Sequence, residues 1–333
     1  MVRIAVIQTA FPGDVVLSTP VFEALKDEFP GCETVAVVRP ESIPLLGSNP
    51  HIDRVLSFDK YGADKGLSGL IRTAARLKGC DRAIIIQRHL RSAVVAYLAR
   101  IPMRIGYSNS NARFLYTDRV EYRGDKHEVQ RCLDLIGISD DDKYRPKIFL
   151  DDGTNRKAED LLRSVGAGPD FAVVAPGSIW PTKRYPYFPG LIHLVNEELS
   201  LPVVLIGGPS DIELSNAIAE SCKKLPPNIT GETNLLESAT IISKAKLAVT
   251  NDSAPAHIAA AVDTPVVAIF GPTVQEFGFS PYSEKSSVVD IGELNCRPCT
   301  THGSARCPQR HFKCMLELQP AKIIEAAKLL LGG

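Results

Sequence analysis

The sequence predicts an α/β protein built from two doubly wound, parallel-sheet domains. Short β-branched runs alternate with amphipathic segments along the whole chain, which is typical of βαβ units. A length of 333 residues is enough for about two domains, each with its own core. The alternation is interrupted once, by polar residues near position 150. We therefore expect one domain over residues 1–155 and a second over residues 156–333.

The first domain is expected to hold five strands, because five short apolar runs occur before residue 110. These runs are residues 3–7, 34–38, 54–58, 82–87 and 104–107. Helical periodicity is clearest in residues 21–29 and 92–100. The acidic residues at 140–142 and 151–152 fall in the polar interruption, so we interpret them as solvated turns rather than cation ligands.

The second domain repeats the pattern. Its expected strands are residues 171–175, 203–207, 247–250 and 266–270. Its expected helices are residues 156–165, 188–199, 212–222, 235–244, 254–262 and 320–331. The last of these helices begins with a proline and is followed by glycines, which is the usual way for a helix to begin and end.

Charge and apolar runs exclude several classes of protein. Lysine plus arginine and aspartate plus glutamate both number 38, so no overall field attracts the chain to nucleic acid or anionic lipid. The first apolar run is closed by Pro12 and is too short for a signal peptide. No run reaches the ~18 apolar residues of a membrane span. We expect a cytoplasmic protein that is at most peripheral at a membrane.

Two doubly wound domains side by side are expected to enclose a cleft lined by the carboxyl ends of their strands. Neither G-x-G-x-x-G after a strand nor G-x-x-x-x-G-K-[ST] occurs, which argues against NAD and ATP chemistry. The chemistry must come from other loops at these strand ends.

Asp14 follows the first expected strand, after the turn-forming residues Pro12 and Gly13. A carboxylate at this position is a candidate general base. It is equally a candidate cap for the helix that follows, and the two roles are compatible.

Three loops of the second domain suggest an anion site. After residues 171–175 come Ser178, Lys183 and Arg184, a loop whose cations can neutralise a leaving phosphate. After residues 203–207, a Gly-Pro turn carries Asp211 and Glu213, either of which is a candidate partner for a ribose hydroxyl.

After residues 247–250 the chain opens an apolar helix. Ser253 is expected to cap this helix, and Ala254 begins it. The free N–H groups of the first turn favour an anion, and His257 is placed to donate to the same anion or to pack structurally. Asp252 is expected to cap the helix or to contact a sugar hydroxyl.

Together these loops resemble a known family, the ADP-heptose:lipopolysaccharide heptosyltransferases, which are family 9 glycosyltransferases of the GT-B fold. The resemblance rests, in this order, on GDVVLSTPVFEALK, PGSIWPTKRYP, LIGGPSD, NITGETNLLESATIISKAKLAVTNDSAPAHIAAA and TPVVAIFGPT. Matching segments run from residue 3 to about residue 273, and the helix over residues 320–331 fits the family's last helix.

The resemblance implies inverting transfer of L-glycero-D-manno-heptose from ADP-heptose to the inner core of lipopolysaccharide, with the second heptose favoured. It assigns Asp14 as the base and Lys183 to the donor phosphates, with Ser178 in the same loop. It places Asp252, Ser253, Ala254 and His257 in the donor-binding segment, where Ala254 replaces the family's glycine. No cofactor is required in this scheme, and the acceptor is a lipid A-core molecule at the inner membrane surface.

Arg88, His89 and Arg91 follow the strand expected at residues 82–87, and their charge suits a phosphorylated acceptor. Other functions stay open: addition of the first heptose or of another sugar, epimerisation or hydrolysis of a nucleotide sugar, and non-catalytic binding of an ADP-sugar or a metal. The oligomeric state is also open.

Four of the eight cysteines lie close together near the C-terminus, as C-x2-C-x7-C-x6-C. They are Cys296, Cys299, Cys307 and Cys314. This spacing permits a structural zinc site, although it differs from the two paired knuckles of a zinc ribbon. Reduced thiols and disulfides are the alternatives.

Overall fold

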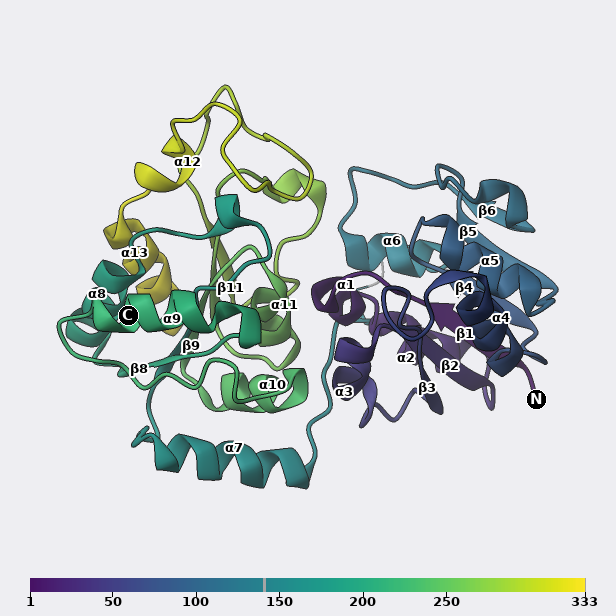
Figure 1. The fold of residues 1–333 in the computed structure, drawn as a ribbon, viewed down its shortest axis with the longest axis horizontal. Coiled ribbons are helices and arrows are strands. Elements are labelled where there is room, and N and C mark those ends of the chain that lie inside the picture. Colours follow the sequence, from purple (N-terminus) through teal and green to yellow (C-terminus); the bar gives the residue numbers. More distant parts are fainter. Residues whose placement is uncertain (140–141, 333) are drawn as a thin grey trace. The chain divides into compact units, whose positions relative to one another are not determined.

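The computed structural model describes residues 1–139 and 142–332, and the chain divides into two units, Met1–Phe149 and Leu150–Gly333 (Figure 1). The division lies a few residues before the boundary expected at residue 155. Of the acidic residues 140–142, the first two lie outside the described residues. The predicted α/β class is confirmed in both units, and the cleft expected between them stays a prediction.

The first unit contains a six-stranded parallel sheet in the order β3-β2-β1-β4-β5-β6. Its strands are β1 (Arg3–Ile7), β2 (Glu33–Val38), β3 (Arg54–Ser57), β4 (Arg82–Ile85), β5 (Met103–Tyr107) and β6 (Asp118–Val120). The order is that of a dinucleotide-binding-type doubly wound sheet. The sixth strand was not expected, because its three residues at the sheet edge have no apolar run.

Helices cover both faces of this sheet. They are α1 (Pro12–Leu17), α2 (Pro20–Glu28), α3 (Ile43–Leu46), α4 (Gly66–Arg76), α5 (Leu90–Leu98) and α6 (Glu128–Asp134), with short 3-10 turns η1 (Pro40–Ser42) and η2 (Arg113–Leu115). Because successive strand residues point to opposite faces, Ala5 and Ile7 pack under α4 and α5. Ile4 and Val6 pack instead in the core that includes α1, α2 and the end of α6.

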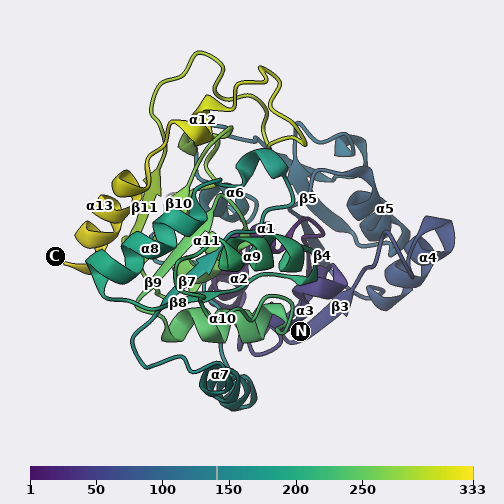
Figure 2. The same ribbon diagram turned by 60° about the vertical axis from the view of Figure 1, so that its left-hand side comes forward.

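The second unit contains a five-stranded parallel sheet in the order β11-β10-β9-β7-β8 (Figure 2). Its strands are β7 (Ala172–Ala175), β8 (Val203–Leu205), β9 (Leu247–Asn251), β10 (Val266–Ile269) and β11 (Ser286–Val289). This is the flavodoxin-like order, in which the direction of winding reverses between the first and third strands. The last strand, β11, was not expected, since it contains only two apolar residues.

The helices of the second unit also form two layers. They are α7 (Asp152–Ser164), α8 (Phe188–Leu199), α9 (Ile212–Glu220), α10 (Leu235–Lys244), α11 (Ala254–Ala261), α12 (Lys313–Leu316) and α13 (Pro320–Leu331), with η3 (Pro181–Lys183), η4 (Pro209–Asp211) and η5 (Gln275–Phe277). Side chains of α8, α9 and α13 share one core with the sheet. The helix α11 packs on β9 and β10 and against α10, which in turn contacts α7.

The helix α7 begins four residues before the predicted start at residue 156. Asp151 is its N-cap, and the Asp151 carboxylate accepts a hydrogen bond of 2.8 Å from the Thr154 amide. The acidic and polar residues that suggested a turn are therefore the cap and first turn of the helix. Within the described ranges 1–139 and 142–332, no helix combines the length and apolar character needed to cross a bilayer.

A buried arginine fixes α6 beside the sheet. Arg131 is 1% exposed, and it pairs with Glu128 across one helical turn at 2.9 Å. Its other N–H groups donate to the carbonyl of Lys126 and the hydroxyl of Tyr122. Burial raises the pKa of Glu128 to about 7; the Arg131 charge lowers it, and the charge of Asp14 adds to the increase.

The raised pKa of Glu128 makes folding depend on pH. Between about pH 4.5 and 7 the folded state keeps a proton that the unfolded chain has lost, so stability falls as pH rises through this window. Replacing Glu128 by Gln removes this loss. The free energy of unfolding of Glu128→Gln minus that of the unchanged protein should increase by about 3 kcal/mol between pH 4.5 and pH 7. Urea unfolding at both pH values measures this difference. The exposed Glu121→Gln is the control, and a pH-independent difference for Glu128→Gln would reject the assignment.

Candidate active site

Four of the predicted site residues follow the strands between which the winding direction of each sheet reverses. Ligands of open α/β sheets bind at this switch point, outside the carboxyl ends of the strands. In the first unit the neighbouring strands β1 and β4 lead to Asp14 and Arg88. In the second unit β7 and β9 lead to Lys183 and Asp252.

Asp14 lies in the first turn of α1 and is half-buried. Its carboxylate accepts a hydrogen bond of 3.2 Å from the backbone N–H of Phe11, so the side chain does help to begin the helix. The electrostatic effect of Asp14 reaches buried Glu128 and Cys132. The candidate base therefore has a second carboxyl group in its surroundings, which sequence spacing alone did not reveal.

The three predicted acceptor residues are exposed at the end of β4. The Arg88 guanidinium lies 4.2 Å from the ring centroid of Tyr122, and Arg91 donates to the Lys60 carbonyl at 2.9 Å. Burial lowers the pKa of His89, and the charges of Lys60 and Arg88 lower it further. The guanidinium groups of Arg88 and Arg91 suit the binding of an anion.

Two further cations, Lys60 and Arg39, join this group, and our sequence reasoning missed both. Lys60 is 7% exposed and donates to the Thr9 carbonyl at 2.7 Å; burial lowers its pKa. Arg39 lies over the rings of Phe11 and Tyr61 at 5.9 and 5.3 Å. Both follow the ends of neighbouring strands, β3 and β2, and that position was the signal available in the sequence.

In the second unit, the structure joins two predicted donor-site residues in one ion pair. The Lys183 Nζ lies 2.6 Å from the Asp252 Oδ2, and both residues are 9% exposed. The Thr273 hydroxyl, after β10, donates to the same carboxylate oxygen at 2.6 Å. Ser253, not Asp252, is the N-cap residue of α11, and the Asp252 carboxylate pairs with Lys183; its expected contact with a sugar hydroxyl stays a prediction. An ammonium has three N–H donors, so Lys183 can pair with Asp252 and also donate to a ligand phosphate.

The loop after β7 is held close to the turn after β8. A Cβ on Gly177 would lie 2.4 Å from the Asp211 Cγ, so any side chain at position 177 would displace the Asp211 carboxylate. The Asp211 carboxylate accepts from the Gly208 N–H at 3.0 Å. Ser178 is buried, and its carbonyl accepts from the Arg184 Nε at 2.9 Å. Asp211 thus lies near the loop that carries Ser178 and Lys183, and its expected contact with a nucleotide stays a prediction.

The helix α11 begins at Ala254 after the N-cap residue Ser253, as expected. The Ser253 hydroxyl nevertheless makes no capping bond to this helix; it donates to the Asn251 carbonyl at 3.3 Å. The N–H groups of the first turn are therefore not occupied by that side chain. His257, one turn along, is 7% exposed.

The four clustered cysteines, Cys296, Cys299, Cys307 and Cys314, are free thiols and form no disulfide. Cys299 donates to the Cys296 carbonyl at 3.0 Å, and burial raises the pKa of both Cys299 and Cys314. Among residues 1–139 and 142–332, no three His, Cys, Asp or Glu side chains are arranged to hold a metal ion. The described residues therefore give no support to the zinc alternative.

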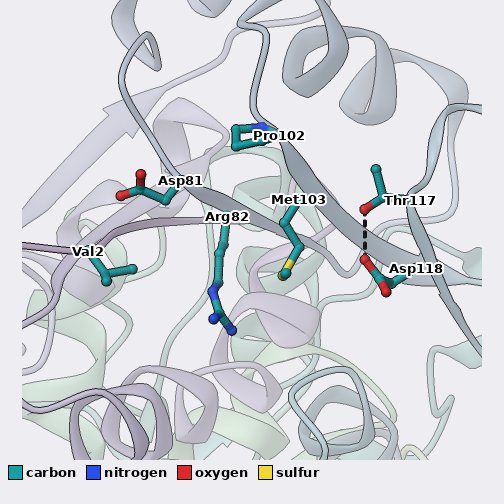
Figure 3. A pocket seen from close by; sticks show the side chains of 7 residues that line it. All are labelled: Val2, Asp81, Arg82, Pro102, Met103, Thr117 and Asp118. Carbon is teal, nitrogen blue, oxygen red and sulfur yellow. Dashed lines mark hydrogen bonds between the residues drawn. The ribbon is translucent and has the colours of Figure 1, made fainter.

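A pocket of about 420 Å³ lies elsewhere, at the amino ends of the strands of the first unit (Figure 3). It is lined by residues including Arg82 and Met103, which begin β4 and β5, and by Thr117, whose hydroxyl donates to Asp118 at 2.7 Å. Doubly wound sheets bind ligands at the opposite edge, so we assign this pocket no part in the chemistry.

Comparison with known proteins identifies the family. The model of glycosyltransferase family 9 (heptosyltransferase) matches residues 70–308. A lipooligosaccharide heptosyltransferase 2 of Haemophilus influenzae is 26% identical over 88% of this chain and 90% of its own length. The structure of a family 9 glycosyl transferase from Veillonella parvula has a TM-score of 0.87 at 25% identity, covering 99% of this chain and 97% of that one.

An Escherichia coli ADP-heptose lps heptosyltransferase II has the same fold, with a TM-score of 0.80 at 23% identity and coverage of 99% and 98% of the two chains. The family model spans well over half of the chain. It includes the loop after β7, the Lys183–Asp252 ion pair and the start of α11. This chain belongs to glycosyltransferase family 9 and is a glycosyltransferase.

Proposed function

We propose that this enzyme transfers L-glycero-D-manno-heptose from ADP-heptose to the inner core of lipopolysaccharide, with inversion at the anomeric carbon. The observation that carries the proposal is the Lys183–Asp252 ion pair at the β7/β9 switch point, beside the start of α11. A buried ammonium and a helix N-terminus together favour a diphosphate. Relatives named heptosyltransferase 2 support the second heptose of the core as the sugar added.

The proposed reaction is a single displacement. Asp14 removes the proton of the acceptor hydroxyl, and the oxygen forms a bond to the anomeric carbon. The bond from that carbon to the diphosphate breaks, and its electron pair leaves with ADP. Lys183 and the N–H groups at the start of α11 stabilise the charge on the departing phosphate. Ser178, Asp211 and His257 are proposed to contact the donor around them.

The acceptor is proposed to bind the first unit through its cations. Arg88, His89 and Arg91 form this surface together with Lys60 and Arg39, which lie at the ends of neighbouring strands. Guanidinium groups bind phosphates and carboxylates in two-point fashion, so this surface suits a phosphorylated, acidic core.

The lipid part of the acceptor is proposed to bring the first unit to the membrane surface. Residues 65–117 contain ten basic residues and one acidic residue, Asp81, in a chain whose total charge is zero. The basic residues are Lys65, Arg72, Arg76, Lys78, Arg82, Arg88, Arg91, Arg100, Arg104 and Arg113. Exposed apolar side chains lie in the same stretch, on α4, α5 and η2: Leu67, Ile71, Tyr97, Leu98 and Phe114. Basic and apolar side chains together favour an anionic bilayer surface.

The reaction is tested by ADP release from ADP-heptose with and without a Kdo-lipid A acceptor that already bears one heptose. We expect release only with the acceptor, and a product heavier by one heptose. Release without acceptor would indicate a hydrolase or epimerase instead. ADP binding without any release would indicate a non-catalytic binding protein.

Removal of the proposed base tests the mechanism separately from binding. Asp14→Ala is expected to lower kcat about 10²- to 10⁴-fold, the usual range for loss of general-base catalysis, because no carboxylate takes the proton. The Kd of ADP, measured by calorimetry, should stay within about twofold, since Asp14 is assigned to the acceptor side. A large loss of ADP binding in this variant would reject the assigned role.

The membrane surface is tested on α4. Leu67→Ser with Ile71→Ser should weaken binding to phosphatidylglycerol-containing vesicles about tenfold or more, because two exposed apolar side chains are lost from the interface. Activity on an acceptor without acyl chains should not change. Leu329→Ser, at a similarly exposed leucine of α13, is the control. If the unchanged protein, the double variant and the control bind vesicles equally, the exposed face of α4 does not contact the membrane.

A further inference from the structure

The cysteine-rich segment, residues 296–314, contacts the loop that carries Lys183 and the turn whose Thr273 donates to Asp252. The segment takes no part in the proposed displacement, so that reaction does not explain its role. Its end is anchored in the core of the second unit through Cys314, which is 4% exposed, and the next residue, Met315, is 0% exposed. The irregular chain before this anchor lies against the loop that carries Lys183.

The first contact holds the residue that precedes Lys183. Thr182 is 4% exposed, and its hydroxyl donates to the Ser304 carbonyl and accepts from the Ser304 N–H, each at 2.8 Å. The Thr182 N–H also points to the Ser304 carbonyl, at 3.2 Å. One threonine thus satisfies both backbone groups of Ser304.

The second contact is with Lys183 itself. Gly303 has a φ of +96°, and a Cβ at this position would lie 2.9 Å from the Trp180 Cβ and 3.2 Å from the Lys183 Cγ. The backbone of the cysteine-rich segment therefore packs directly on the stem of the lysine side chain. Any bulk added at Gly303 must displace Trp180 or Lys183.

The third contact reaches Asp252, the partner of Lys183. Arg297 has a nearly buried side chain, pairs with Asp290 at 2.9 Å and donates to the Thr273 carbonyl at 2.9 Å. The Thr273 hydroxyl donates to Asp252, as described above. The Cys299 N–H donates to the Pro272 carbonyl at 3.0 Å in the same turn.

We propose that the cysteine-rich segment is a positioning element of the donor site, in which Thr182 and Gly303 fix the place of the Lys183 ammonium and Arg297 fixes the turn that orients Asp252. The inference rests on the proposed function, because it assumes that Lys183 binds the donor diphosphate. A charged side chain held in place before the ligand arrives loses little freedom on binding. Loss of these contacts should therefore weaken binding of ADP and of the donor.

The test compares variants in the full-length enzyme by calorimetric ADP binding, steady-state kinetics and melting temperature. Thr182→Val keeps the shape of the side chain and removes both hydroxyl hydrogen bonds. It should raise the Kd of ADP and the KM of the donor about tenfold, as expected for the loss of two buried hydrogen bonds. Thr182→Ser should restore both values, because it keeps the hydroxyl. Ser304→Ala is the control, since Ser304 uses its backbone toward Thr182 and its hydroxyl toward the Arg306 carbonyl.

A second pair of variants tests the contact on Lys183 without depending on Thr182. Gly303→Ala and Gly166→Ala both place a side chain at a left-handed φ, +96° and +71°, so both carry a backbone strain of the same kind. Nothing lies within 4 Å of a Cβ at Gly166, which lies between α7 and β7. Gly303→Ala should therefore raise the Kd of ADP several-fold more than Gly166→Ala does.

The outcomes separate this inference from the proposed function. If the unchanged protein binds ADP and Lys183→Ala weakens that binding, but Thr182→Val and Gly303→Ala match their controls, the positioning role is wrong and the donor site stands. A fall in kcat with an unchanged Kd would also overturn it, because a loss of folded protein alone gives that result. If the unchanged protein does not bind ADP, the proposed function fails, and this inference fails with it.

Discussion

All strands of each sheet run in the same direction, and this constraint decides where the side chains of the candidate site can meet. Parallel strands end at a common edge, so residues far apart in the sequence become neighbours there. Lys60, Asp14 and Arg88 follow β3, β1 and β4 and lie along one edge of the first sheet. Lys183 and Asp252 follow β7 and β9 and meet at 2.6 Å. The same constraint separates the amino-edge pocket from the chemistry.

The carboxyl edges of the two sheets differ in the partners of their buried lysines, Lys60 in the first unit and Lys183 in the second. Lys183 is buried with a carboxylate, which offsets the cost of removing the ammonium from water. Lys60 is buried with carbonyl and amide oxygens as partners and with other cations around it, so burial and repulsion lower its pKa. Such a cation gains more from an incoming anion than one already paired. The first edge is thus suited to recruit an acidic acceptor, and the second to hold a donor in a fixed place.

Much of the fold could be predicted, because buried parallel strands are continuous apolar runs and loops carry turn residues. The missed strands β6 and β11 are short and lack such a run. Asp14, Lys183 and Asp252 could be found by their position after strands and by resemblance to family motifs. That Asp252 holds Lys183 could not, since an ion pair between residues 69 positions apart depends on strand order. Glu128 was missed for a related reason: its pKa is set by the burial of the first turn of α6, which no local pattern encodes.

The cysteine-rich segment shows how a lack of regular structure can serve a site. A chain outside helices and sheets must find partners for its backbone groups elsewhere in the protein. In this segment the partners come from the site loops: Thr182 satisfies both groups of Ser304, and Pro272 accepts from Cys299. The bonds that make the segment stable therefore also restrain the loop that carries Lys183 and the turn that holds Thr273, the hydrogen-bond donor to Asp252. A regular helix in its place would satisfy its own backbone and leave those loops free to move, so the irregularity itself couples the segment to the donor site.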